Sequence, residues 1–408
     1  MGIDKILKSR EHEQPVEKSL TFAATANRAY EEAYWKEIFS LAHGEYTNKD
    51  NADVVQNHPT LHKVHHQERD LHKIGDYLRR QYEKAIREAG MEGKSVAGEL
   101  PFRWETDFEY LQFGGWKANQ EGKEYERNIL VVIPGKNRNE AVVMADHYDT
   151  AYMEDVFAAG NGESGARVSA AGADDNYSAS ATLLLAAPVF LKMSREGKLE
   201  RDIWLLHLTG EEFPSDCMGA RNFAQHVVQG TLTLKKPDGN TLDLSGVKVN
   251  GVLVMDMIAH NKDHDRNIFQ ISPGTTGESL RLAYEAHMAC RAWNSNVPLW
   301  NEAPERKGCL PGQRSVKIDE MPPKSLHLKV DGEIRTWEDP HSTLYNTDGI
   351  IFSDTGIPVI LFMENYDINR QGYHDMHDTM ENIDLDYGAA VSAIAVETVA
   401  RIATKKTE

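Results

Sequence analysis

Histidine and carboxylate residues follow apolar runs of this sequence, at positions where predicted strands end. The run 141–146 leads into His147 and Asp149, and a long loop then brings Asp175 to the start of a predicted helix. Parallel α/β sheets present their ligands in this way, at the carboxyl ends of buried strands. The sequence therefore predicts that the first half of a functional site lies at this end of a sheet.

Metal-type side chains also follow three later apolar runs. They are Glu211 and Glu212 after 203–208, Asp256 at the end of 251–256, and His374 in the loop after 357–363. Imidazole nitrogen and carboxylate oxygen suit Zn²⁺ or a similar divalent cation. One carboxylate has two oxygens, so it can bridge two metal ions about 3.5–4 Å apart. A metal-activated water is expected as the nucleophile, because no Gly-x-Ser-x-Gly motif occurs.

These residues belong to short motifs that occur in a specific order. The motifs are His-x-Asp at 147–149, Gly-Ala-Asp-Asp-Asn at 172–176, Glu-Glu at 211–212, Val-Met-Asp-Met-Ile at 254–258, and His-x-x-x-Asp-Thr at 374–379. As an ordered set they resemble the co-catalytic two-zinc exopeptidases of the M28 aminopeptidase family. The resemblance covers roughly 105–256 and 346–402, and it implies a zinc-dependent aminopeptidase that acts on peptides.

The resemblance also implies a role for each matching residue. The implied ligands of two zinc ions per chain are His147, Asp175, Glu212, Asp256 and His374, with Asp175 as the bridge. Glu211 would be the general base. Asp149 would hydrogen-bond the imidazole of His147 and fix its tautomer. Tyr373 would polarise the oxyanion of the tetrahedral intermediate.

Simpler interpretations exist for several of these residues. Scattered, unrelated polar side chains are the alternative for the ligand set, but agreement in order and type favours a site. Asp174 is expected to be structural. His377 competes with His374, and the spacing to the following Asp-Thr pair favours His374. The histidine-rich tract 58–72 favours a solvated or core-edge helix over a metal site, because no carboxylate is placed to complete a ligand set.

The elements expected around these motifs alternate along the chain. The expected strands are 108–113, 128–133, 141–146, 203–208, 251–256 and 357–363, with a hairpin at 231–244. The expected helices are 20–43, 61–89, 176–193, 220–228, 278–290 and 387–404. This alternation predicts an α/β fold with a mixed, largely parallel central sheet and helices on both faces.

Two regions are expected beyond that core. Residues 1–104 are interpreted as an N-terminal helical segment that packs on the core or forms a surface for a homo-oligomer. Residues 105–408 are interpreted as the catalytic domain. Within it, residues 257–345 are rich in Pro, Asn and charge, and they are expected to form an insertion that caps the cleft.

Bulk composition excludes several classes of partner. The chain has 408 residues, of which 40% are hydrophobic, which is enough for a sizeable core. Its 45 basic and 63 acidic residues give a net charge of −18, which argues against nucleic acid and anionic membranes as partners. No stretch approaches the roughly 18 uncharged apolar residues of a membrane span. The start of the chain lacks an apolar signal-peptide core, which favours a cytoplasmic location unless a leader has been removed.

Other functions remain open on the same scaffold. A carboxypeptidase would need a cation for the substrate carboxylate, and the candidates are Arg221, Arg266, Arg291 and Arg314. An aminopeptidase would use an acidic rim for the free amine, with Asp216, Glu364 or Asp348 as candidates. A single-zinc glutaminyl cyclase is disfavoured because the two-metal ligand set is complete. A non-catalytic binding domain is disfavoured because such a domain would be expected to have lost ligands.

Overall fold

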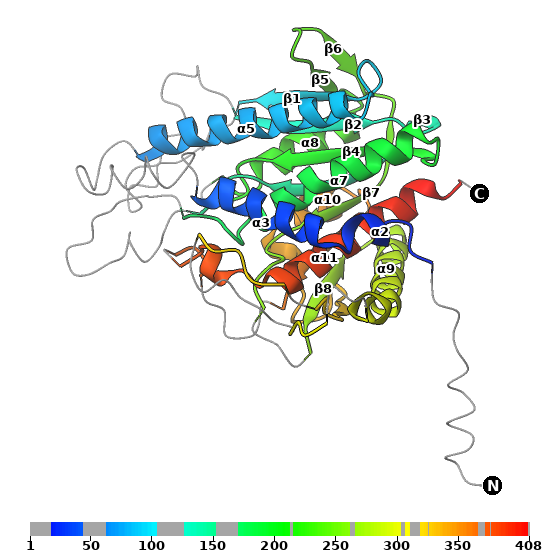
Figure 1. Ribbon diagram of the computed structural model, residues 1–408. Coiled ribbons are helices and arrows are strands. Elements are labelled where there is room, and N and C mark those ends of the chain that lie inside the picture. The colour runs from blue at the N-terminus through cyan, green and yellow to red at the C-terminus, as the bar shows by residue number, and fades with distance from the viewer. Residues whose placement is uncertain are drawn as a thin grey trace.

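One sheet crosses the molecule, and helices cover both of its faces (Figure 1). The computed structural model describes residues 18–43, 63–103, 126–151, 170–212, 215–261, 266–302, 307–310, 319–324, 326–365, 372–375 and 377–406. The strand order is β6-β5-β1-β2-β4-β3-β7-β10-β8-β9. The strands are β1 Val96–Phe102, β2 Glu126–Ile133, β3 Asn137–His147, β4 Arg201–Leu208, β5 Thr233–Lys235, β6 Thr241–Asp243, β7 Lys248–Met255, β8 Ile268–Pro273, β9 Asp331–Ile334 and β10 Val359–Glu364.

The centre of this sheet is parallel. Strands β4, β3, β7 and β10 pair in parallel, so their carboxyl ends share one edge of the sheet. Residues 141–145 of β3 form a continuous apolar run because both faces of the strand are covered. Val142 and Met144 belong to one hydrophobic cluster, whereas Val143 and Ala145 belong to the other. The predicted mixed α/β fold is confirmed, and antiparallel pairings flank the parallel centre on both sides.

Helices form a layer on each face of the sheet. The helices are α2 Phe22–Thr25, α3 Arg28–His43, α5 Lys63–Glu88, α7 Tyr177–Arg195, α8 Met218–Gln229, α9 Gly277–Asn301, α10 Gly349–Asp354 and α11 Leu385–Thr404, with short 3₁₀ turns at Leu344–Asn346 and Met380–Asn382. The larger cluster joins α3, α5, α7, α9 and α11 to one face, and the smaller joins α8 and α10 to the other. The N-terminal helices thus share a core with the central strands. Among the described helices, none is long and apolar enough to cross a membrane.

Most expected elements are present, but three strands were not foreseen. Strand β1 contains Gly98 and Pro101, residues that normally weaken a strand. Gly98 is required there because a Cβ atom would lie 2.5 Å from the carbonyl oxygen of Lys235 on β5. Strand β1 pairs with β5 only at Glu99 and Lys235. The missing N–H of Pro101 therefore does not cost a hydrogen bond to β5. The expected strand 108–113 and most of the histidine tract 58–72 lie outside the described side chains.

The segment 257–345 differs from the expected insertion. It adds β8 and β9 to the edge of the sheet, with β8 antiparallel to β10 and β9 parallel to β8. Helix α9 packs against α11 and fills part of the larger core. Near its end, Thr343 and Tyr345 reach the cavity described below. Most of this described segment therefore extends the sheet and its helical layer.

Candidate active site

The five predicted metal ligands come together at the carboxyl edge of the parallel strands. His147 is the last residue of β3, Asp256 follows β7, and Asp175 precedes α7. Glu212 lies in the turn after β4, and His374 lies in the segment after β10. Three overlapping groups of these residues have ligand atoms within 4.8 Å of one another, and Glu211 joins one of them.

The ligand atoms form two sets that share Asp175. In the first set, His147 Nε2 lies 3.4 Å from Asp175 Oδ1 and 3.4 Å from Asp256 Oδ1. In the second set, His374 Nε2 lies 3.4 Å from Asp175 Oδ2 and 3.2 Å from Glu212 Oε2. Each oxygen of Asp175 therefore faces a different set, as a bridging carboxylate requires.

These separations fit zinc. Two ligands at about 2.0–2.1 Å from one tetrahedral Zn²⁺ lie about 3.3 Å apart. The histidine-to-carboxylate distances of 3.2–3.4 Å in both sets match that value. The donor types, two imidazoles and three carboxylates, are also those that zinc accepts.

Electrostatics favour cations at the same place. Burial raises the pKa of Glu211 well above its usual range, and the nearby Glu212 and Asp256 raise it further, against the opposing effect of His147. Burial likewise raises the pKa of Glu212. Burial alone would lower the pKa of His374, but Glu212 and Asp175 raise it to about 12. The site therefore carries more buried negative charge than its own histidines balance, and divalent ions would supply the remainder.

Asp149 makes a different contact from the one expected. His147 Nδ1 lies 3.1 Å from the carbonyl oxygen of Asp149 but 3.7 Å from its carboxylate. The carboxylate instead accepts hydrogen bonds from the backbone N–H groups of Glu211, at 3.2 Å, and Glu212, at 3.1 Å. Asp149 thus fixes the imidazole through its main chain and the Glu-Glu turn through its side chain.

Asn176 holds the peptide groups on both sides of Asp256. Its Nδ2 donates to the carbonyl of Met255 at 3.0 Å, and its Oδ1 accepts from the N–H of Met257 at 3.1 Å. The side chain is fully buried. Asp174 acts in the same region, because its Oδ1 accepts from the N–H of Ala259 at 2.8 Å. The structural role expected for Asp174 agrees with this contact.

Asp378 performs a similar task for the bridging residue. Its carboxylate accepts hydrogen bonds from the N–H groups of Asp174, at 2.8 Å, and Asp175, at 3.1 Å. Asp378 lies four residues after His374, so one segment supplies a ligand and secures the backbone of another. The sequence offered Asn176 only as a possible N-cap of the following helix, and its side chain makes no such cap bond. Asp378 was given no role of its own, although both residues stand inside the motifs.

Substitution of Asn176 by Leu tests this support. The change would leave the carbonyl of Met255 and the N–H of Met257 buried and unpaired, at about 1–3 kcal/mol each. We expect the free energy of unfolding of the metal-free protein to fall by about 2–6 kcal/mol in urea titrations. Asn294→Leu is the control. The Nδ2 of Asn294 donates to the carbonyl of Val330 and its Oδ1 accepts from the N–H of Val330, far from the site. Both variants should lose stability, but only Asn176→Leu should weaken zinc binding. Equal zinc affinities in the two variants would contradict the role of Asn176.

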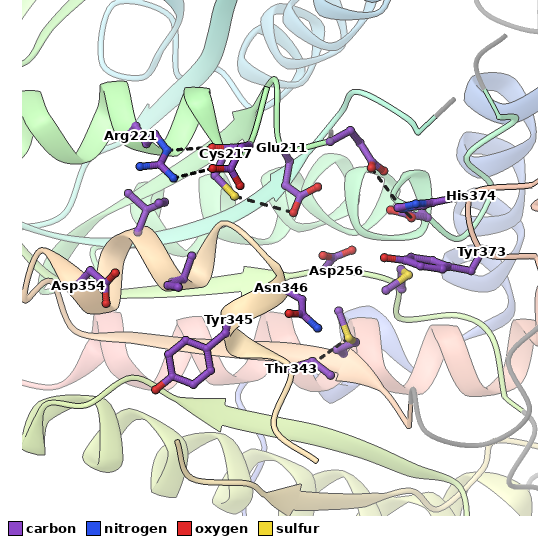
Figure 2. Close-up of a pocket in the computed structure, with 17 residues that line it drawn as sticks. Glu211, Cys217, Arg221, Asp256, Thr343, Tyr345, Asn346, Asp354, Tyr373 and His374 are labelled. Atoms are coloured by element: carbon purple, nitrogen blue, oxygen red, sulfur yellow. Dashed lines mark hydrogen bonds and ion pairs between the residues drawn. The ribbon is translucent and has the colours of Figure 1, made fainter. Parts of the chain in front are cut away.

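A cavity of about 650 Å³ opens above the ligands (Figure 2). Asp175, Glu211, Glu212, Asp256 and His374 line its metal-binding end. The Tyr373 ring stacks on the His374 ring, with centroids 3.7 Å apart and planes 25° apart. Figure 2 shows its hydroxyl directed into the cavity. Tyr373 thus lies in the cavity wall beside His374.

The remaining candidates divide between the cavity wall and the interior. Asp216 and Arg221 both line the cavity and form an ion pair at 2.9 Å. Glu364 and Asp348 are buried and are not among its lining residues. Cys217 Sγ lies 4.0 Å from Glu211 Oε1, and burial raises the pKa of its thiol far above the usual range. Of the three acidic rim candidates, Asp216 is therefore the one that a substrate could reach.

Comparison with known proteins supports the same family. Residues 128–299 match the model of peptidase family M28. No curated protein matches the chain. The LapA aminopeptidase of Legionella pneumophila is similar in structure, with a TM-score of 0.54 and 15% identity over 97% of this chain and 78% of that one. The glutaminyl cyclase of Bacteroides thetaiotaomicron, bound to N-acetylhistamine, is also similar in structure. Its TM-score is 0.55, with 14% identity over 91% of this chain and 97% of that one.

A leucine aminopeptidase precursor from the same Bacteroides species gives a TM-score of 0.54 and 14% identity over 91% of this chain and 96% of that one. At these identities the solved structures establish a shared fold. The match of residues 128–299 to the model of peptidase family M28 agrees with the resemblance that the ordered motifs predicted.

Proposed function

We propose that the chain is an aminopeptidase that uses two zinc ions to hydrolyse the N-terminal residue from peptides. The observation that carries the proposal is the placement of the two Asp175 oxygens in two separate ligand sets. Bound zinc would lower the pKa of water to about 7 and polarise the substrate carbonyl. The five ligands of the two sets would hold the ions, and the cavity would hold the peptide.

Glu211 is the residue that moves the proton. Its Oε2 lies 4.0 Å from His147 Nε2, and its side chain lines the cavity. A carboxyl group beside the proposed metal ions that is not itself a ligand can both accept and donate a proton. Glu211 would take the proton from the attacking water and pass it to the leaving amine. The hydrogen bonds from the Glu-Glu turn to Asp149 keep Glu211 at this position.

Tyr373 is the proposed donor to the developing oxyanion. Its hydroxyl is directed into the cavity, and its ring is fixed against His374 by stacking. A donor that is already oriented toward the position of the developing charge stabilises the transition state without reorganising. Asp216 would attract the free amine of the substrate at the cavity wall.

A panel of substrates tests the proposal against its alternatives. We expect rapid release of p-nitroaniline from free aminoacyl p-nitroanilides and none from the N-acetylated forms. N-blocked dipeptides with a free carboxylate would report a carboxypeptidase, and cyclisation of glutaminyl peptides would report a cyclase. The cyclase needs a specific test because one similar structure is a glutaminyl cyclase. Faster turnover of N-blocked than of free substrates would contradict the aminopeptidase assignment.

Removal of metal should abolish activity. We expect a chelator to eliminate turnover and to lower the Tm, because the buried carboxylates then lose the cations that balance them. Added Zn²⁺ should restore both, with saturation at about two ions per chain. Activity and elemental analysis on the same samples provide the measurement. Full activity of protein shown to be metal-free would rule out the mechanism.

A further inference from the structure

A chain of buried polar side chains runs beneath His147, from α5 to the first turns of α7. The hydroxyl of Tyr82 lies 2.6 Å from His207 Nε2, and His207 Nδ1 lies 2.7 Å from Asp146 Oδ1. Ser180 Oγ donates to Asp146 Oδ2. The four side chains are essentially inaccessible to solvent, at 1% exposure or less.

A proton on His207 Nδ1 is compatible with both contacts of the ring. Tyr82 would then donate to Nε2, and Nδ1 would face Asp146 Oδ1 at ion-pair distance, without the geometry of a hydrogen bond. Ser180 satisfies the other carboxylate oxygen. The carboxylate of Asp146 is thus approached from two elements, by His207 of β4 and by Ser180 of α7.

Two members of this set, Asp146 and Ser180, lie close in sequence to two of the proposed metal ligands. Asp146 directly precedes His147 in β3, and it lies opposite His207 in the register of β3 and β4. Ser180 lies in the first turns of α7, five residues after Asp175. A carboxylate held from both sides therefore fixes the strand end that carries one ligand relative to the helix start that follows another. Hydrogen-bond partners beyond the ligands commonly set metal affinity in this way.

We infer that Tyr82 is a positioning residue of the metal centre, supplied by a helix outside the segment that matches the family model. The inference rests on the proposed two-zinc centre. It also gives the N-terminal helices a role beyond packing, because α5 contributes the first member of the chain that orients Asp146. Helix α5 is then part of the catalytic unit rather than only a packing element.

The test compares Tyr82→Phe with Tyr30→Phe. Tyr30 is a matched control, because its buried hydroxyl also makes a 2.6 Å hydrogen bond, but to Ser392 on α11. Zinc binding to chelator-treated protein is measured by calorimetry without substrate. We expect Tyr82→Phe to weaken binding of at least one of the two ions by about tenfold, the lower end of the effect of losing an outer partner. Tyr30→Phe should bind both ions as the wild type does, even at an equal loss of Tm.

Ser180→Ala is an independent test, because it removes the hydrogen bond on the other side of Asp146. It should weaken zinc binding in the same direction, and the double variant should lose less affinity than the sum of the two single losses. Wild-type affinity in Tyr82→Phe, or an equal loss in Tyr30→Phe, would overturn the inference while leaving the proposed function intact. If the wild-type protein bound no zinc, both the inference and the proposed function would be ruled out.

Discussion

Glu211→Gln is expected to lower kcat by at least about 100-fold, since positioned general acid–base catalysis contributes roughly 10²–10⁴-fold. The amide keeps the shape of the carboxyl but cannot take the proton of the attacking water. Both zinc ions should remain, because the two ligand sets around Asp175 do not require Glu211. Steady-state kinetics and elemental analysis on one preparation measure the two results together.

Asp354→Asn is the matched control for this substitution. Asp354 lines the same cavity and belongs to none of the groups that could hold a metal ion among the described residues. The same loss of one negative charge should leave kcat unchanged there. If Glu211→Gln retained near-normal kcat with its zinc in place, another residue would have to be the base.

The second large effect is expected from Asp175→Ala. This change removes one ligand from each set at once, because the two oxygens of Asp175 face His147 and His374 separately. Zinc affinity should fall by more than the about 10–100-fold that follows loss of an outer partner. Activity should then fall to background at ordinary zinc concentrations.

Calorimetry and elemental analysis distinguish this result from that of Glu211→Gln, which keeps its metal. Asp354→Ala is again the control, and it should bind two ions. Retention of both ions by Asp175→Ala would show that the carboxylate does not bridge the two sites.

Residues at strand ends were the predictable part of the site. His147 and Asp256 could be predicted because each follows an apolar run that is buried on both faces, so its position at the carboxyl edge follows from the strand. The order of the motifs then added the remaining ligands. The resemblance to family M28 was predictable on the same basis, and residues 128–299 match that family's model.

Contacts made by the main chain could not be predicted. The carboxylate of Asp149 binds the backbone of the Glu-Glu turn, and a sequence pattern carries no signal for that acceptor. Strand β8 was missed because it contains Gln270, a polar residue whose amide bonds the carbonyl of Glu364 inside the sheet. The contact between Tyr82 and His207 joins residues 125 positions apart, and only the packing of α5 brings them together.

The two hydrogen bonds that the carboxylate of Asp378 accepts have a mechanical consequence. The segment that contains His374 also accepts a hydrogen bond from the backbone of Asp175, through Asp378. One short segment therefore positions two proposed ligands, His374 and Asp175. Displacement of that segment would move His374 and remove the hydrogen bond to the backbone of Asp175. Loss of these two hydrogen bonds should therefore weaken both proposed sites, because Asp175 faces both ligand sets.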